Sequence, residues 1–193
     1  MPYELHANGR VDIAAGKYWV DFINSGRTGA GFNVYSANRN DGPWFYTIES
    51  GKRLSDYWSA VAVTSGKYDL RVFGPNGFLR EFKGDLALAG TGRAQPELES
   101  IYDPANGRIV LRLRNTGNAA CTLTVRPNRY SSAAARTYTI APGATVDDAW
   151  SISGSGHWYD LSVTSNTDAG YLRRLAGHVE NGFASISDPA IGA

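Results

Sequence analysis

Apolar and polar residues alternate along several short stretches of this chain. In residues 17–23 every second position is apolar, and residues 30–34 repeat the pattern. Alternation with a period of two is typical of a β-strand that buries one face. The inward positions of these two stretches are Tyr18, Val20, Phe22, Ala30, Phe32 and Val34. We expect them to form part of a hydrophobic core.

A tight hairpin is predicted late in the first half of the chain. Residues 68–72 alternate in the same way, and residues 78–83 follow after the sequence Gly74-Pro75-Asn76-Gly77. Asn-Gly is a strong hairpin signal because both residues tolerate a positive φ.

The chain contains an internal repeat. Residues 16–26 align with residues 107–117 at an offset of 91, and Asn24-Ser25-Gly26 returns there as Asn115-Thr116-Gly117. Trp58 matches Trp150, and Tyr68-Asp69-Leu70 matches residues 159–161. The inward strand positions of the second copy are Ile109, Leu111, Leu113, Cys121, Leu123 and Val125.

The length of the repeat indicates the domain organisation. A period near 90 residues is close to the size of an immunoglobulin-like sandwich and too long for a solenoid unit. The abundance of Gly and Tyr beside a single Met favours strands and turns. We therefore predict an all-β protein of two tandem immunoglobulin-like antiparallel β-sandwich domains, residues 1–89 and 97–193, joined by a linker at residues 90–96.

Composition narrows the possible functions. Lys and Arg number 19 against 18 Asp and Glu, a formal net charge of +1, which gives no electrostatic reason to bind nucleic acid. Cys121 is the only cysteine, so no disulfide forms within the chain, and we expect a buried structural thiol. No signal peptide or membrane-spanning stretch is recognisable, and the chain resembles a segment of a longer protein.

Catalytic and metal-binding motifs are not recognisable in the sequence. It contains no GxSxG, HExxH, P-loop or CxxC pattern. The histidines His6, His157 and His178 do not align across the repeats, and Asp41, Asp56 and Asp69 lack the spacing of a calcium loop. We predict no catalytic residue, no metal and no cofactor for this chain.

Two arginines recur at matching positions of the two repeats, on strand faces that point inward. A buried guanidinium needs hydrogen-bonded partners. We predict structural ion pairs of Arg80 with Asp56 and of Arg173 with Asp148; anion capture by Arg80 is the alternative.

Three aromatic residues are candidates for binding. Trp44 and Phe45 follow a turn and match Arg136 and Thr137 of the second repeat, so the fold does not demand them. Together with Phe78 at the hairpin tip they are suited to a lipid interface, a sugar or another domain, or they pack locally under a loop. All lysines lie in the first repeat, at Lys17, Lys52, Lys67 and Lys83.

The chain resembles the repeated C-terminal domain of bacterial phospholipases C that cleave phosphatidylcholine or sphingomyelin and are related to acid phosphatases. The resemblance is carried by the segments Tyr3–Arg10, Asn24–Gly26, Phe32–Tyr35, Tyr46–Lys52, Leu54–Trp58 and Tyr68–Phe78. It is weaker in the second repeat, which lacks the Gly-Pro-Asn-Gly-Phe turn. In that family a separate N-terminal phosphoesterase domain carries the catalytic chemistry, and the enzymes are exported.

The resemblance implies a non-catalytic accessory region of a secreted or periplasmic phospholipase C. Its expected partners are the N-terminal phosphoesterase domain of the parent chain and a phospholipid membrane surface. It either helps the enzyme engage its lipid substrate or stabilises the catalytic domain. The alternative is a free-standing immunoglobulin-like module that binds carbohydrate or protein.

Overall fold

The computed structural model describes residues 2–190, and most of their regular structure is β-strand. The first repeat contains β1 (Leu5–Asp12), β2 (Lys17–Asn24), β3 (Ala30–Ser36), β4 (Trp44–Ile48), β5 (Lys52–Ser59), the short helix α1 (Ala60–Thr64), β6 (Lys67–Phe73), β7 (Leu79–Asp85) and the 3-10 turn η1 (Leu86–Leu88). The second contains β8 (Pro96–Asp103), η2 (Pro104–Asn106), β9 (Arg108–Asn115), β10 (Cys121–Arg129), β11 (Arg136–Ile140), β12 (Thr145–Ser151), η3 (Ser153–Ser155), β13 (Trp158–Ser165) and β14 (Leu172–His178). The strand pairs are antiparallel, so the predicted all-β antiparallel fold is confirmed.

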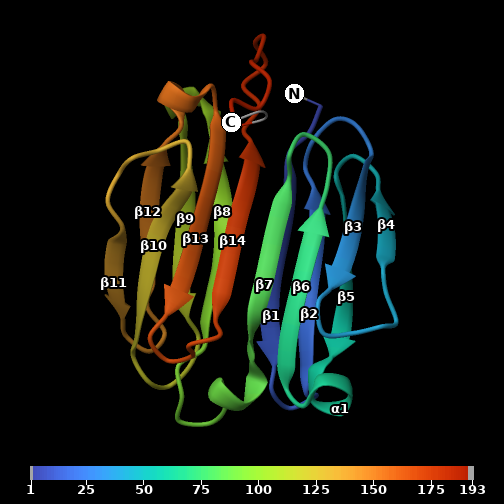
Figure 1. Ribbon diagram of the computed structural model, residues 1–193, viewed down its shortest axis with the longest axis vertical. Helices are drawn as coiled ribbons and strands as arrows, with labels where there is room; N and C mark the ends of the chain where they lie inside the picture. Colours follow the sequence, from blue (N-terminus) through green and yellow to red (C-terminus); the bar gives the residue numbers. More distant parts are fainter. Residues whose placement is uncertain (1, 191–193) are drawn as a thin grey trace.

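One long sheet runs through both repeats. Its eight strands are ordered β11-β10-β13-β14-β7-β6-β3-β4, and the last strand of each repeat pairs with the other, β14 with β7. We call this pairing of β7 with β14 the seam, and Figure 1 shows it at the middle of the molecule. Two three-stranded sheets, β1-β2-β5 and β12-β9-β8, cover the two halves of the long sheet. The pairing at the seam gives two otherwise open strand edges a partner.

Each repeat has its own hydrophobic core. One core is built from residues between Leu5 and Leu86, the other from residues between Ala94 and Val179. The alternating positions predicted to face inward are all buried in both repeats, with Tyr18, Val20 and Phe22 fully enclosed. Burial of this apolar area is the main stabilising contribution to each half.

Local predictions are also confirmed. Asn76 and Gly77 have φ values of 58° and 69°, as the Asn-Gly turn requires. The thiol of Cys121 is free and buried, and burial raises its pKa.

The predicted linker is partly structured. The carbonyls of Arg93 and Gln95 accept hydrogen bonds from Asn118 and Thr116. The first repeat has the same arrangement, where Pro2 accepts from Arg27. Residues 93–95 therefore pack as the start of the second repeat, and the division of the chain into two immunoglobulin-like domains stays a prediction. Within residues 2–190, no helix has the length and apolar character to cross a membrane.

Candidate functional site

Arg80 lies on β7 at the seam and its side chain is buried in the second repeat. Only 1% of the residue is exposed. Its hydrogen-bond acceptors are the carbonyls of Leu79 (2.8 Å) and Ala176 (3.1 Å) and the hydroxyls of Ser100 (3.3 Å), Tyr102 (2.7 Å) and Tyr159 (3.0 Å). The guanidinium also lies 4.3 Å from the ring centre of Phe78. These neutral contacts hold a charge that would be costly to bury alone.

Arg173 lies on β14 of the second repeat and hydrogen-bonds groups of the first repeat, as Arg80 does in the opposite direction. Its guanidinium donates to the carbonyl of Lys83 at 2.9 Å and to the hydroxyl of Tyr68 at 2.9 Å, both in the first repeat. Tyr68 and Tyr159 are equivalent residues of the two repeats, so each arginine bonds the other repeat's tyrosine. Arg173 differs from Arg80 in having a carboxylate partner, Glu97, at 3.4 Å. The two arginines therefore tie the repeats to each other.

The predicted ion pairs with Asp56 and Asp148 are not formed. Asp56 accepts a hydrogen bond from Tyr46 at 2.6 Å, and Asp148 pairs with Arg136 at 2.6 Å. Topology explains the error, because β5 and β12 are the outer edges of the three-stranded sheets whereas β7 and β14 meet at the centre of the long sheet. The expectation that both arginines are buried and hydrogen-bonded is confirmed, with partners from the opposite repeat.

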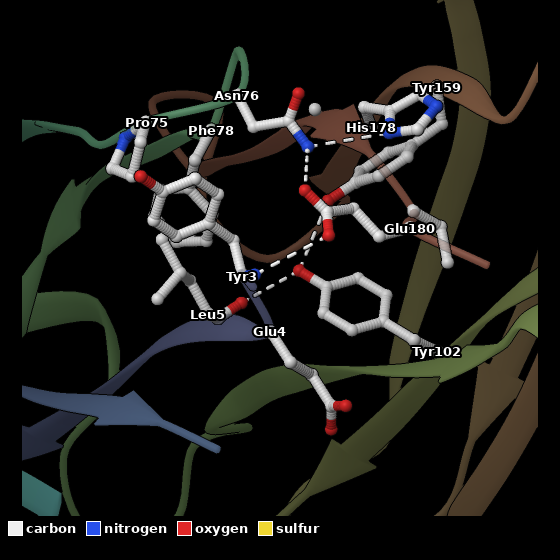
Figure 2. A pocket seen from close by; sticks show the side chains of 12 residues that line it. Tyr3, Glu4, Leu5, Pro75, Asn76, Phe78, Tyr102, Tyr159, His178 and Glu180 are labelled. Carbon is white, nitrogen blue, oxygen red and sulfur yellow. Dashed lines mark hydrogen bonds between the residues drawn. The ribbon is translucent and has the colours of Figure 1, made fainter. Parts of the chain in front are cut away.

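A small hollow opens at one end of the seam. Figure 2 shows the carboxylate of Glu180 between Asn76 above it and Tyr102 below it, with Tyr159 to one side. Asn76 donates to Glu180 at 3.0 Å, and the backbone amide of Tyr3 donates to the same carboxylate at 3.5 Å. The hollow measures about 20 Å³, room for about one water molecule and far too little for a lipid headgroup or a sugar.

Burial at the seam shifts the pKa of two side chains. Burial raises the pKa of the Glu97 carboxyl to about 7, although Arg173 opposes this shift. Burial, assisted by the charge of Arg80, lowers the pKa of His6 to about 4. His6 is therefore neutral at pH 7, where its ring stacks on Tyr102 at 4.8 Å.

Replacing Glu97 with glutamine should flatten the pH dependence of stability. The folded carboxyl binds its proton more tightly than the unfolded one, whose pKa is 4.5, so its stabilising contribution is complete below pH 4.5 and is lost as the pH rises through 7. Between those limits the free energy of unfolding of the wild type should fall by about 3 kcal/mol more than that of Glu97→Gln. Urea unfolding at pH 5 and pH 8 measures this. Glu99→Gln, on the same strand, is the control and should behave as wild type; a parallel pH profile for Glu97→Gln would contradict the prediction.

The histidines near the end of β14 serve as hydrogen-bonding groups. His178 Nε2 lies 3.1 Å from the carbonyl of Gly156, which only accepts, so Nε2 carries the proton. It is therefore not free to take a proton from Ser185, 2.6 Å away. In residues 2–190 no three His, Cys, Asp or Glu side chains gather as a metal-binding group.

The three aromatic candidates differ in their exposure to solvent. Phe78 is buried at 5% exposure and packs edge-on against Phe32, which agrees with the alternative of local packing and not with a surface contact. Trp44 is half-buried, 5.5 Å from Trp58. Phe45 is 65% exposed, as a surface contact requires.

Phe45 belongs to an exposed aromatic group that sequence analysis missed. On the outer face of the long sheet Phe45 pairs with Asn33, which pairs with Phe73 on the next strand. Tyr35 follows on the same face, and its ring meets that of Phe73 at 5.7 Å. We call Tyr35, Phe45 and Phe73 the aromatic face. The period-two pattern contains part of the signal, since Tyr35 and Phe73 continue the outward positions of the stretches 30–34 and 68–72.

The second repeat lacks this feature. The outer face of β10 and β11 carries threonines, with Thr124 and Thr137 at the positions of Asn33 and Phe45. Their hydroxyls lie 3.4 Å apart. The sheet therefore forms without aromatic residues on this face.

These features define an all-β protein built from a repeated module, fused at a buried seam and carrying exposed aromatic residues on one repeat. The chain belongs to the family described as "Bacterial phospholipase C, C-terminal domain", whose model matches residues 1–85 and again residues 96–178. The predicted resemblance is thereby confirmed.

Named relatives agree. The chain is 52% identical over 191 residues to the non-hemolytic phospholipase C of Burkholderia pseudomallei, and 40% identical over 212 residues to the hemolytic phospholipase C of Pseudomonas aeruginosa. These alignments cover 99% of this chain but only 27% and 29% of the relatives, so it corresponds to the C-terminal part of a larger enzyme. A solved transglutaminase from red sea bream overlaps 93% of this chain and 32% of its own at 11% identity and a TM-score of 0.27, too low to bear on the fold.

Proposed function

We propose that this chain is the non-catalytic accessory region of a secreted phospholipase C and that it holds the enzyme at its lipid substrate. The observation that carries this proposal is the aromatic face, where Phe45, Tyr35 and Phe73 are 65%, 44% and 40% exposed. Tyr35 suits a membrane interface because its ring is apolar and its hydroxyl is polar, and the phenyl rings of Phe45 and Phe73 supply apolar area that can insert beside it. The family match favours this accessory role over a free-standing binding module.

A second candidate role is the stabilisation of the parent's N-terminal phosphoesterase domain. The start of the chain is fixed at the seam, where the carbonyl of Leu5 accepts from Tyr102 at 2.7 Å and the amide of Tyr3 donates to Glu180. A preceding domain would thus join the molecule beside both repeats. This role requires no contact with lipid.

Replacing the aromatic face should weaken binding to lipid vesicles. The variant Phe45→Thr/Phe73→Thr introduces threonine, which the second repeat has at the position of Phe45, and should reduce the partition coefficient onto phosphatidylcholine vesicles by about tenfold. Vesicle sedimentation measures the bound fraction, and Thr137→Ala is the control. If the wild-type chain binds no vesicles, the lipid role is wrong and the second candidate remains.

A further inference from the structure

Two neighbouring loops at one end of the first repeat expose apolar side chains and no charged ones. The turn between β1 and β2 contributes Ile13, Ala14 and Ala15, and α1 contributes Val61, Ala62 and Val63. We call these six residues the apolar tip. Ile13, Val61 and Val63 are 40%, 58% and 56% exposed. Such exposure is unfavourable in water.

The two loops form one surface. The amide of Val61 donates to the carbonyl of Gly16 at 3.1 Å. A Cβ at Gly16 would lie 2.9 Å from that of Val61, so glycine permits the close approach. Figure 1 shows α1 beside the β1–β2 turn, at the end of the molecule away from the chain's beginning.

The second repeat builds the same loops from more polar residues. Asp12 and Asp103 each accept the backbone amide three residues ahead, so the two turns share one geometry. Ser153 occupies the position of Val61, at the offset of 92 that relates Trp58 to Trp150. Ser155 corresponds to Thr64, because the two hydroxyls donate to matching pairs of carbonyls, so Val63 lies in a loop that is one residue shorter in the second repeat. The exposed valines are therefore not a requirement of the fold.

The rim of the apolar tip carries charges of both signs. Lys17 stands opposite Asp12 in the β1–β2 ladder, and Lys67 stands opposite Asp85 in the β6–β7 ladder. Neither lysine comes within ion-pairing distance of a carboxylate among the described residues, and the ammonium of Lys17 lies over the ring of Tyr57, 3.6 Å from its centre. Alternating charges with no net excess complement a zwitterionic headgroup layer, which likewise presents both signs without net charge.

We propose that the apolar tip inserts into the interface of a zwitterionic phospholipid membrane. The aliphatic side chains enter the acyl boundary, while the rim lysines and aspartates face the phosphate and ammonium groups. A protein partner fits less well, because three aliphatic side chains and three methyl groups offer far less than the roughly 800 Å² per partner of a stable protein interface. The inference rests on the proposed lipid role and adds the part of the molecule that enters the membrane.

The test uses this chain with Val61→Ser/Val63→Ser, in which Val61→Ser copies Ser153 of the second repeat and both substitutions replace exposed side chains. Sedimentation with phosphatidylcholine vesicles should show a loss of binding of about tenfold or more. Binding of the wild-type chain should change by less than about twofold between low and high salt. Circular dichroism and thermal unfolding confirm that the variant is folded, and Ala105→Ser in the second repeat's turn is the matched control.

Other outcomes separate this inference from the proposed function. If Val61→Ser/Val63→Ser binds as wild type while Phe45→Thr/Phe73→Thr binds weakly, the apolar tip is not the insertion site and the lipid role stands. If wild type binds only anionic vesicles with steep salt dependence, charge drives binding and the inference is wrong. Absence of binding to any vesicle overturns both.

Discussion

Replacing Arg173 with methionine should lower the free energy of unfolding by about 3 to 5 kcal/mol at pH 8. The substitution leaves the carboxylate of Glu97 buried at 7% exposure, where its remaining hydrogen bond among residues 2–190 comes from the amide of Val11, at 3.2 Å. It also removes the donor to Tyr68 and to the carbonyl of Lys83 across the seam. Uncompensated burial of charge makes the largest contribution to this loss.

Urea unfolding followed by tryptophan fluorescence measures the effect. The control is Arg112→Met, which breaks two hydrogen bonds to Asp147, at 2.9 and 2.8 Å. The two side chains are 40% and 46% exposed, so the loss should be far smaller than for Arg173→Met. Adding Glu97→Met to Arg173→Met should recover part of the loss, because it removes the orphaned charge. Equal losses for Arg173→Met and Arg112→Met would show that the seam does not depend on this guanidinium.

Arg80 offers a comparison within the same molecule. Its partners are hydroxyls and carbonyls, so Arg80→Met leaves no buried charge behind and should cost less than Arg173→Met. The deficit of Arg173→Met should also shrink toward pH 5, since burial raises the pKa of Glu97 and the carboxyl takes up a proton there. Both comparisons rest on one difference between the two arginines: Arg173 has the carboxylate of Glu97 as a partner, whereas the partners of Arg80 are neutral.

The sequence was sufficient to predict the strands but not how the repeats join. Burial alternates with period two along each strand, so local composition determines which side chains face the core. Pairing of β7 with β14 depends on backbone hydrogen bonds between residues about 90 positions apart, and any open strand edge presents the same groups. The predicted partners of Arg80 and Arg173 were wrong because they were sought within one repeat.

The burial of Phe78 was predictable from strand geometry. Phe78 and Arg80 are two positions apart, and residues at that spacing lie on the same face of an extended chain. An inward Arg80 therefore requires an inward Phe78, which lies against the guanidinium at 4.3 Å. Trp44 follows the same rule, because Tyr46 and Ile48 share its inward face. Phe45 has the opposite parity and is exposed.

Replacing Asn115 with alanine should lower the free energy of unfolding by about 3 to 4 kcal/mol, because it removes four hydrogen bonds and leaves buried backbone groups unpaired. The side chain is 1% exposed. Its amide donates to the carbonyls of Ala119 (2.7 Å) and Ile140 (3.1 Å), and its oxygen accepts from the amides of Gln95 (3.1 Å) and Gly117 (3.1 Å). Urea unfolding measures the loss, and Asn106→Ala at an exposed turn is the control, expected to cost about 1 kcal/mol or less.

Asn24 is the equivalent residue of the first repeat and should show a similar loss. Its amide donates to the carbonyls of Thr28 at 2.9 Å and Ile48 at 3.0 Å, and its oxygen accepts from Gly26 at 3.1 Å. Asn115→Asp should be at least as harmful as Asn115→Ala, since a carboxylate keeps the acceptor but loses both donors and buries a charge. If Asn115→Asp is tolerated, shape alone accounts for the site. If it is not, the Asn-x-Gly sequence that revealed the repeat is required because a single amide side chain joins separate segments of each repeat.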